Sequence, residues 1–148
     1  MSLHSYTRLW VHLIWATRSR QRVLNKQARK LLSGYLYRYA QEKDIYMKIN
    51  YVNPEHVHVL FDMPATYSTD KVAQLFKGSS SKWLNDQQVL PGKFNWGRGY
   101  GAFSVSHSKV DEVARYIANQ EEHHKRVGFQ DEIRKFVQVY GLVWHDED

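Results

Sequence analysis

Cysteine is absent from the 148 residues of the chain. Its absence excludes disulfide-stabilised scaffolds, thiolate zinc sites and thiol nucleophiles together. Histidine, carboxylate, amide, hydroxyl and phenol groups remain for any chemistry, and a chain without disulfides fits a reducing compartment. We therefore expect a cytoplasmic protein whose metal ligands or nucleophile come from these groups.

Long hydrophobic runs are also missing. The longest, Leu9 to Ala16, contains His12 and is too short to span a bilayer. The amino terminus lacks the pattern of a signal peptide. Charged residues make up 24% and hydrophobic residues 43% of the chain, as in ordinary soluble proteins and unlike disordered chains. These features predict a soluble, untargeted protein of one domain, residues 1–148, without a membrane partner.

Acidic residues are scarce at the beginning of the chain. Residues 1–43 hold nine basic residues and one acid, a net charge of +8, whereas the remainder sums to −2. Tryptophans and tyrosines are interleaved with the basic residues. This composition is typical of a nucleic-acid partner, because phosphates pair with Lys and Arg while rings stack on exposed bases. A solvated helix face would look the same, so charge nominates nucleic acid without proving it.

Hydrophobic periodicity predicts an α+β fold. Strands are expected at residues 9–16, 45–52, 55–62 and 102–106. The first helix is expected at residues 26–42, and a second helix follows an N-cap at Ser68. A third helix should run from a Ser108–Asp111 capping box to about Arg126, and a fourth from Gln130 to Tyr140. Asn53-Pro54 favours an antiparallel hairpin, residues 85–101 form a long glycine-containing loop, and Gly128 is expected to end the third helix. The order resembles a split βαβ, ferredoxin-like antiparallel sheet with helices packed on one face.

The sequence His56-Val57-His58 lies within the third predicted strand. Period 2 places both imidazoles on one face of the sheet, about 6 to 7 Å apart at their Cα atoms, while Val57 faces the other side. Two such imidazoles can converge on one metal ion. A chance His-x-His on a half-exposed strand is the alternative, since the chain holds eight histidines.

Tyr116 and Gln120 lie four residues apart on the third predicted helix, at the edge of its apolar stripe. A phenol and an amide one turn apart can face a single substrate. The alternatives are a tyrosine that packs its ring on the core with a solvated hydroxyl, and an exposed glutamine.

Together, these residues resemble the signatures of the single-tyrosine HUH transposases, which include the TnpA-type transposases of small bacterial insertion sequences and the REP-associated tyrosine transposases. His56-Val57-His58 is similar to the His-hydrophobic-His signature, and Tyr116-Ile117-Ala118-Asn119-Gln120 to the Tyr-Ile-x-x-Gln signature. The resemblance covers nearly the whole chain. It extends to the basic turn Thr17-Arg18-Ser19-Arg20-Gln21-Arg22-Val23-Leu24, to Phe76-Lys77-Gly78, and to Gly99-Tyr100-Gly101-Ala102-Phe103-Ser104-Val105.

The resemblance implies a metal-dependent DNA transposase with a ferredoxin-like sheet and a C-terminal catalytic helix. His56, His58 and Gln120 would hold Mg²⁺ or Mn²⁺, and Tyr116 would attack single-stranded DNA to give a 5′-phosphotyrosine. None of these ligands is anionic, so the bare site should hold hard cations weakly and the scissile phosphate should complete it. The doubled His123-His124 offers an alternative third ligand.

The expected partners are single-stranded and hairpin DNA and a second copy of the chain, with active sites shared between subunits. The residues expected to contact DNA are Arg18, Arg20, Arg22, Lys77, Lys82, Arg98 and Tyr100. Two alternatives remain: an inactive or domesticated relative that binds hairpin DNA or RNA, and an HUH nickase of replication or plasmid transfer. The second is usually larger and often has paired tyrosines on the active helix, whereas this helix has one.

Overall fold

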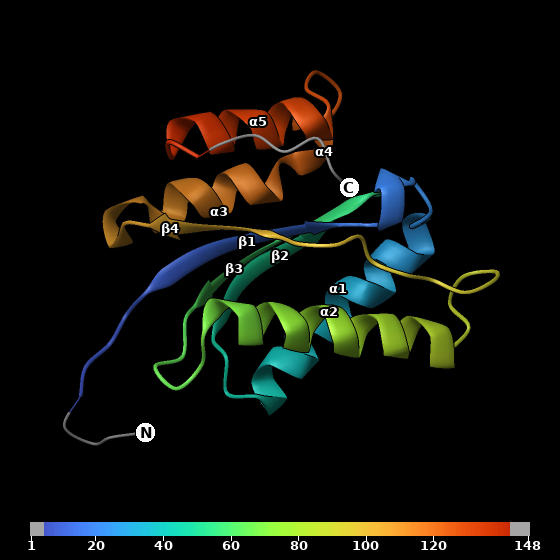
Figure 1. Ribbon diagram of the computed structural model, residues 1–148, viewed down its shortest axis with the longest axis horizontal. Coiled ribbons are helices and arrows are strands. Elements are labelled where there is room, and N and C mark those ends of the chain that lie inside the picture. Colours follow the sequence, from blue (N-terminus) through green and yellow to red (C-terminus); the bar gives the residue numbers. More distant parts are fainter. Residues whose placement is uncertain (1–4, 143–148) are drawn as a thin grey trace.

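The computed structural model describes residues 5–142, which form a four-stranded antiparallel sheet with strand order β2-β3-β1-β4 (Figure 1). The strands are β1 (Trp10–Ala16), β2 (Met47–Val52), β3 (His56–Asp62) and β4 (Gly101–Val105). The α-helices are α1 (Lys26–Glu42), α2 (Thr69–Asp86), α3 (Val110–Ala118), α4 (Gln120–His123) and α5 (Phe129–Val139), and the short 3-10 turns are η1 (Arg18–Arg20) and η2 (His107–Lys109).

Helices cover both faces of the sheet. The long helices α1 and α2 lie on one face, whereas α3 and α5 lie on the other (Figure 1). The larger core lies under α1 and α2 and includes Leu13, Val59 and Phe76, and a smaller core under α3 includes Leu60 and Ile117. The predicted ferredoxin-like α+β fold is confirmed. The expected packing on one face holds for α1 and α2, whereas the catalytic-helix candidate α3 and the helix α5 cover the opposite face.

Several predicted boundaries are confirmed because they depend on local signals. The first helix spans residues 26–42 as predicted, and the Asn25 side chain accepts a hydrogen bond from Ala28 N at 2.9 Å at its start. Ser68 caps α2 by accepting a hydrogen bond from Lys71 N at 3.1 Å. The hairpin at Asn53-Pro54 is also present, with β2 and β3 antiparallel.

The third predicted helix differs from the expectation. Ser108 lies inside η2 rather than at a cap, and α3 begins only at Val110. The helix is interrupted at Asn119, where ψ reaches 23°, so Tyr116 and Gln120 belong to two consecutive helices. Gly128 does not end a helix but is the extended residue that precedes α5. The predictions of a Ser108 capping box and of one continuous helix to Arg126 were therefore wrong.

The long loop before β4 is fastened to the end of β1. Gly97 N donates to Ala16 O at 2.8 Å, and a Cβ at Gly97 would lie 3.0 Å from Thr17 O, so a larger residue would have to push this backbone contact apart. The ammonium group of Lys77 donates to the carbonyl oxygens of Gly97 and Gly99, both at 2.9 Å. Among the helices that the structure describes, none has the length and apolar character needed to cross a membrane.

Candidate active site

Strand β3 places His56 and His58 side by side on the face covered by α3 and α5. Both side chains are fully buried, and their Nε2 atoms lie 3.1 Å apart. Val57 and Val59, between and after them, point into the larger core on the opposite face. The period-2 prediction that both imidazoles share one face is therefore confirmed.

Neighbouring polar groups orient the two imidazoles. On β1, His12 Nε2 lies 2.8 Å from His58 Nδ1. Glu55 Oε1 lies 2.8 Å from His56 Nδ1, and Glu55 in turn accepts a hydrogen bond from Arg22 at 2.5 Å. Because Nδ1 of each ring is engaged, Nε2 of each ring faces the space beneath α3 and α5.

Burial keeps the His58 ring in a form suited to metal binding. Burial, with a smaller contribution from the nearby His56, lowers the pKa of His58 to about 4 against the opposing effect of Glu132. Burial, together with His58, also holds the pKa of His12 well below its ordinary value. Imidazoles with lowered pKa values are neutral at pH 7, which is the form that ligates a metal.

Tyr116 reaches the same space from α3. Its ring lies 6.1 Å from the His58 ring between centroids, and its hydroxyl donates a hydrogen bond to the carboxylate of Glu132. Burial and the Glu132 charge raise the pKa of Tyr116 well above its ordinary value. The phenol is thus neutral in this arrangement, and its oxygen faces the histidine pair of its own chain.

Gln120 is fully buried despite the interruption before α4. Its Oε1 accepts a hydrogen bond from Asn53 Nδ2 at 3.2 Å and lies 2.9 Å from His124 Nε2, while its Nε2 donates to Glu132 at 3.2 Å. Asn53 Nδ2 also lies 3.1 Å from His56 Nε2. The alternative of an exposed glutamine is wrong, since the amide lies beside the histidine pair.

Glu132 and His124 also lie at this site, and the sequence had indicated only His124. Glu132 on α5 is 3% exposed, and its Oε1 lies 3.3 Å from His56 Nε2, 3.4 Å from His58 Nε2 and 3.2 Å from His124 Nε2. Sequence reasoning weighed His124 as a ligand but missed Glu132. The available signal was an acidic residue between Phe129 and Phe136, within the apolar stripe of an amphipathic helix.

These groups fit a divalent cation. One ligand atom from each of His56, His58, His124 and Glu132 lies within 4.8 Å of the others. Three imidazole nitrogens surround Glu132 Oε1, yet this oxygen makes no hydrogen bond of acceptable geometry. Such an arrangement is expected when the four atoms point toward one cation position rather than at one another. Three nitrogens and a carboxylate oxygen form a typical donor set for such ions. The carboxylate also adds the negative charge that the predicted ligand set lacked.

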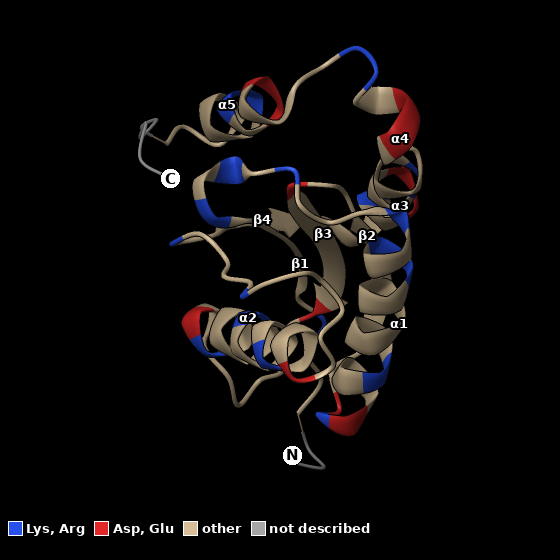
Figure 2. Ribbon diagram, turned by 90° about the vertical axis from the view of Figure 1, so that its right-hand side faces the viewer, with Lys and Arg blue, Asp and Glu red and all other residues tan. Residues whose placement is uncertain are grey.

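The residues predicted to contact DNA fall into several structural settings. Arg18 and Arg20 belong to η1, directly after β1. Arg22, Lys77 and Lys82 already have protein partners, namely Glu55, the loop carbonyls of Gly97 and Gly99, and Asp86 at 2.8 Å. Figure 2 shows that Lys and Arg recur along α1, whose outer face is solvated.

Arg20, Arg98 and Tyr100 meet at a cavity of about 700 Å³ beside the candidate site. Its walls come from the end of β1, the loop before β4 and the α5 residues Phe129 and Ile133. The Tyr100 hydroxyl donates to Asp70, and burial followed by Asp70 raises the pKa of Tyr100 to about 12. The sequence therefore identified three residues that the fold brings together at one opening.

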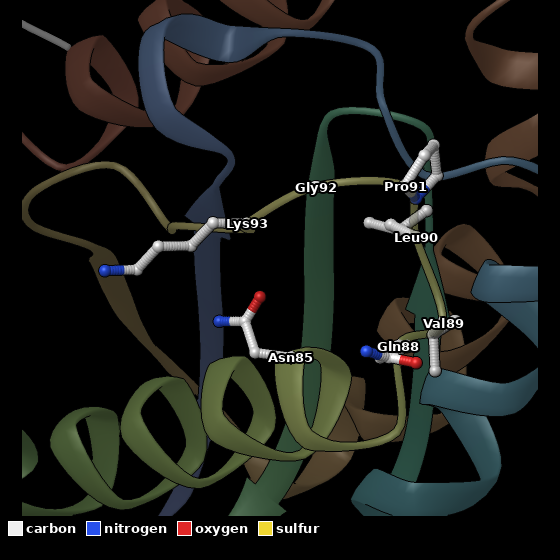
Figure 3. Close-up of a pocket in the computed structure, with 7 residues that line it drawn as sticks. All are labelled: Asn85, Gln88, Val89, Leu90, Pro91, Gly92 and Lys93. Atoms are coloured by element: carbon white, nitrogen blue, oxygen red, sulfur yellow. The ribbon is translucent and has the colours of Figure 1, made fainter.

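A second hollow, also of about 700 Å³, lies at the end of α2 (Figure 3). It is formed by the turn that follows the helix, where Asn85 exchanges hydrogen bonds with the backbone of Phe94 at 2.7 and 3.0 Å. Its lining contains no histidine, carboxylate or tyrosine. It therefore lacks the histidine, carboxylate and phenol groups that the candidate site contains.

Comparisons with known proteins agree with the resemblance of the sequence motifs. The model of a family described as IS200-like transposases matches residues 5–120. Among solved structures, a protein identified as a transposase from Deinococcus radiodurans R1 is 24% identical with a TM-score of 0.64, and the match covers 81% of this chain and 96% of that one. A REP-associated tyrosine transposase bound to a REP hairpin is 14% identical with a TM-score of 0.58, covering 86% and 76%.

At these identities the structural matches support the fold alone, and the search of curated proteins gives no match. The family match, in contrast, covers most of the chain and contains His56, His58, Tyr116 and Gln120. On this basis the chain belongs to the IS200-like transposase family.

Proposed function

We propose that this protein is a single-tyrosine transposase that cleaves and rejoins single-stranded DNA through a 5′-phosphotyrosine. One observation carries the proposal: the Tyr116 hydroxyl and the Nε2 atoms of His56 and His58 all face the Glu132 carboxylate. A phosphate in that place would contact the nucleophile and the cation ligands at once. Proximity of this kind is what phosphoryl transfer requires of a protein.

His56, His58 and Gln120 would hold a divalent cation, Mg²⁺ or Mn²⁺. When bound, the cation would neutralise charge that develops on the phosphoryl oxygens and on the leaving oxygen. His12 and Glu55 keep the two imidazoles turned toward the site.

Tyr116 would act as the nucleophile. Its phenol oxygen forms a bond to phosphorus while the bond from phosphorus to the 3′-oxygen breaks, so that the phenol loses a proton and the 3′-oxygen gains one. The products are a 5′-phosphotyrosine and a free 3′-OH. The phosphotyrosine retains the energy of the phosphodiester, so a second 3′-OH can reverse the step at a new end without ATP.

Hairpin and single-stranded DNA are the proposed partners. The REP-associated relative is bound to a REP hairpin, and this chain has a basic first third with the opening formed by Arg20, Arg98 and Tyr100. Arg18, Arg22 and the other predicted basic residues would contribute sequence-independent phosphate contacts. Because such contacts are electrostatic, DNA affinity should fall steeply with salt.

A homodimer with shared sites remains part of the proposal. In the single chain, Tyr116 lies at its own histidines, which favours assembly of the site within one subunit. The turn η2 between β4 and α3 and the interruption at Asn119 flank the tyrosine helix, and a change of backbone conformation at η2 could redirect it to a neighbouring subunit. Mixing Tyr116→Phe with a His56→Ala, His58→Ala chain distinguishes the two arrangements, since only sharing restores a complete site.

The experiment that tests the function is covalent capture of DNA. Wild-type protein, Tyr116→Phe and the control Tyr46→Phe are incubated with labelled single-stranded DNA that carries a candidate hairpin, with Mg²⁺ or Mn²⁺, and resolved on a denaturing gel. Tyr46 is 54% exposed and lies at the end of β3 opposite His56, where its carbonyl oxygen accepts a hydrogen bond from Asp62 N. Adducts are expected for the wild type and Tyr46→Phe only. Adducts that persist in Tyr116→Phe would show that another residue is the nucleophile.

A further inference from the structure

Helix α5 buries a charged residue, rather than an apolar one, against the rest of the protein. The only fully buried residue of α5 is Glu132, a carboxylate, whereas its apolar residues Phe129 and Ile133 line the cavity of about 700 Å³. A helix that docks on a sheet ordinarily buries an apolar stripe. Here the buried residue is a charged group that inserts into the candidate active site, beside the partly buried aromatic rings of the same helix. The helix also lies beyond residues 5–120, the part matched by the transposase family.

The Glu132 carboxylate bridges the two halves of the site. One oxygen, Oε1, lies 3.3 Å from His56 Nε2 and 3.4 Å from His58 Nε2. The other, Oε2, accepts hydrogen bonds from the Tyr116 hydroxyl and from Gln120 Nε2. A phosphodiester that is to be attacked by Tyr116 while held at the histidines needs this same place, and its non-bridging oxygens carry the same charge as a carboxylate.

We propose that Glu132 is a cation ligand of the DNA-free protein and that it occupies the place of the scissile phosphate, so that α5 has to withdraw before DNA can be cleaved. This inference rests on the proposed function. Glu132, His56, His58 and His124 complete the cation site without DNA. Arrival of the phosphate then exchanges one anionic ligand for another.

The path of α5 supports withdrawal. The helix is preceded by Gly128 in an extended conformation, and its far end is held by the Tyr140 hydroxyl, which donates to Ser104 O at 2.7 Å. Between these ends, Phe136 stacks on Phe103 at 5.0 Å between ring centroids. Phe129 stacks on the His56 ring at 4.0 Å and Phe136 contacts the His12 ring at 5.3 Å between ring centroids, so α5 covers the histidine face of the site. The cavity beside Ile133 leaves part of this helix face open.

The first test measures cation binding without DNA. Co²⁺ is titrated into wild-type protein, Glu132→Gln, Glu132→Ala and the control Asp131→Asn, with visible absorption of Co²⁺ and the thermal shift of the protein as readouts. Asp131 is an exposed carboxylate next to Glu132 on the same helix. Wild type and the control should bind alike, and both Glu132 variants should bind at least about tenfold more weakly. Equal Co²⁺ affinity for Glu132→Gln and wild type would overturn the assignment of Glu132 as a ligand.

The second test holds α5 in place. The chain has no cysteine, so Ser104→Cys with Tyr140→Cys gives a unique pair for a short bismaleimide, and each single variant treated with the same reagent is the matched control. We expect the cross-linked chain to lose DNA adducts while the controls keep them. A cross-linked chain that forms adducts at the rate of the controls would overturn withdrawal.

Glu132→Gln separates this inference from the proposed function. Because Glu132 has to leave before cleavage, Glu132→Gln should form DNA adducts faster than wild type, and an equal rate would overturn its displacement. Loss of adducts in Glu132→Gln, with Tyr116-dependent adducts retained in Asp131→Asn, would show that the carboxylate is needed during the reaction and overturn its displacement. Absence of adducts from every protein would count against the transposase chemistry instead, and the Co²⁺ titration would still decide whether Glu132 is a ligand.

Discussion

The contact between His12 and His58 allows us to predict how much His12 contributes to stability and to cation affinity. His12 is 1% exposed, and its Nε2 lies 2.8 Å from His58 Nδ1. In His12→Leu, a side chain of suitable volume replaces the imidazole but leaves His58 Nδ1 buried without a partner. An unsatisfied buried polar group costs about 1–3 kcal/mol. For a chain of this length, that corresponds to a fall in Tm of about 2–12 °C.

His12→Leu should also lower the affinity for the cation, independently of its effect on stability. Loss of a group that orients a metal-ligating histidine typically lowers metal affinity about 10- to 100-fold, or roughly 1.4–2.8 kcal/mol. His12→Gln is the matched control, because its side-chain amide can reach the place of the imidazole Nε2 and keep the contact with His58. We expect His12→Gln to retain most of the affinity for Co²⁺ and most of the Tm.

The assays are thermal unfolding without metal and Co²⁺ titration monitored by visible absorption. A His12→Leu protein that unfolds earlier but binds Co²⁺ as tightly as wild type would refute the orienting role and leave His12 a purely structural residue. A His12→Gln protein as impaired as His12→Leu would show that the imidazole itself is needed.

Three further predictions concern the third ligand, the pH dependence of stability and the smaller core. Gln120→Ala should abolish DNA adducts, whereas His124→Ala should weaken Co²⁺ binding mainly in the DNA-free protein; the reverse pattern would make His124 the ligand of the reaction. The free energy of unfolding should fall by about 3 kcal/mol between pH 6.5 and pH 4, since unfolded His58, with an ordinary pKa of 6.5, takes up a proton before the folded form at about 4. Urea unfolding of wild type and His58→Asn checks this, because the variant should lose much of the dependence. Ile117→Ala should cost about 2–5 kcal/mol in denaturant unfolding while Val139→Ala, at an exposed position, costs almost nothing; similar values for both would contradict the packing under α3.

Features of the fold that depend on residues close together in the sequence could be predicted from the sequence. Strand β3 shows why: alternation assigns His56 and His58 to one face whatever lies opposite, and Ser68 caps α2 through a bond to a residue three positions on. The helix around Tyr116 was harder. Its interruption at Asn119 comes directly before Gln120, whose side chain accepts a hydrogen bond from Asn53. These two positions are 67 residues apart, so no local rule contains the contact.

The composition of the site depends even more on tertiary structure. Sequence motifs identified His56, His58, Tyr116 and Gln120, but they could not show that a residue from the last helix fills the space between them. The helical stripe of α5 did contain the clue, since an apolar face has no local reason to include Glu132. A charge at an apolar position has to be stabilised by a partner, and the partner is visible only once the sheet is assembled.

This placement changes the electrostatic account of the site. The predicted ligands were all neutral, so the scissile phosphate was expected to supply the anion that holds a hard cation. With Glu132 inserted, the site already contains a carboxylate among His56, His58 and His124 before DNA arrives. A bound cation then need not raise the affinity for DNA, because in the proposal the phosphate replaces a ligand instead of filling an open position. In the proposed displacement, the energetic cost is the release of α5, so that α5, rather than the histidine pair, would determine access to Tyr116.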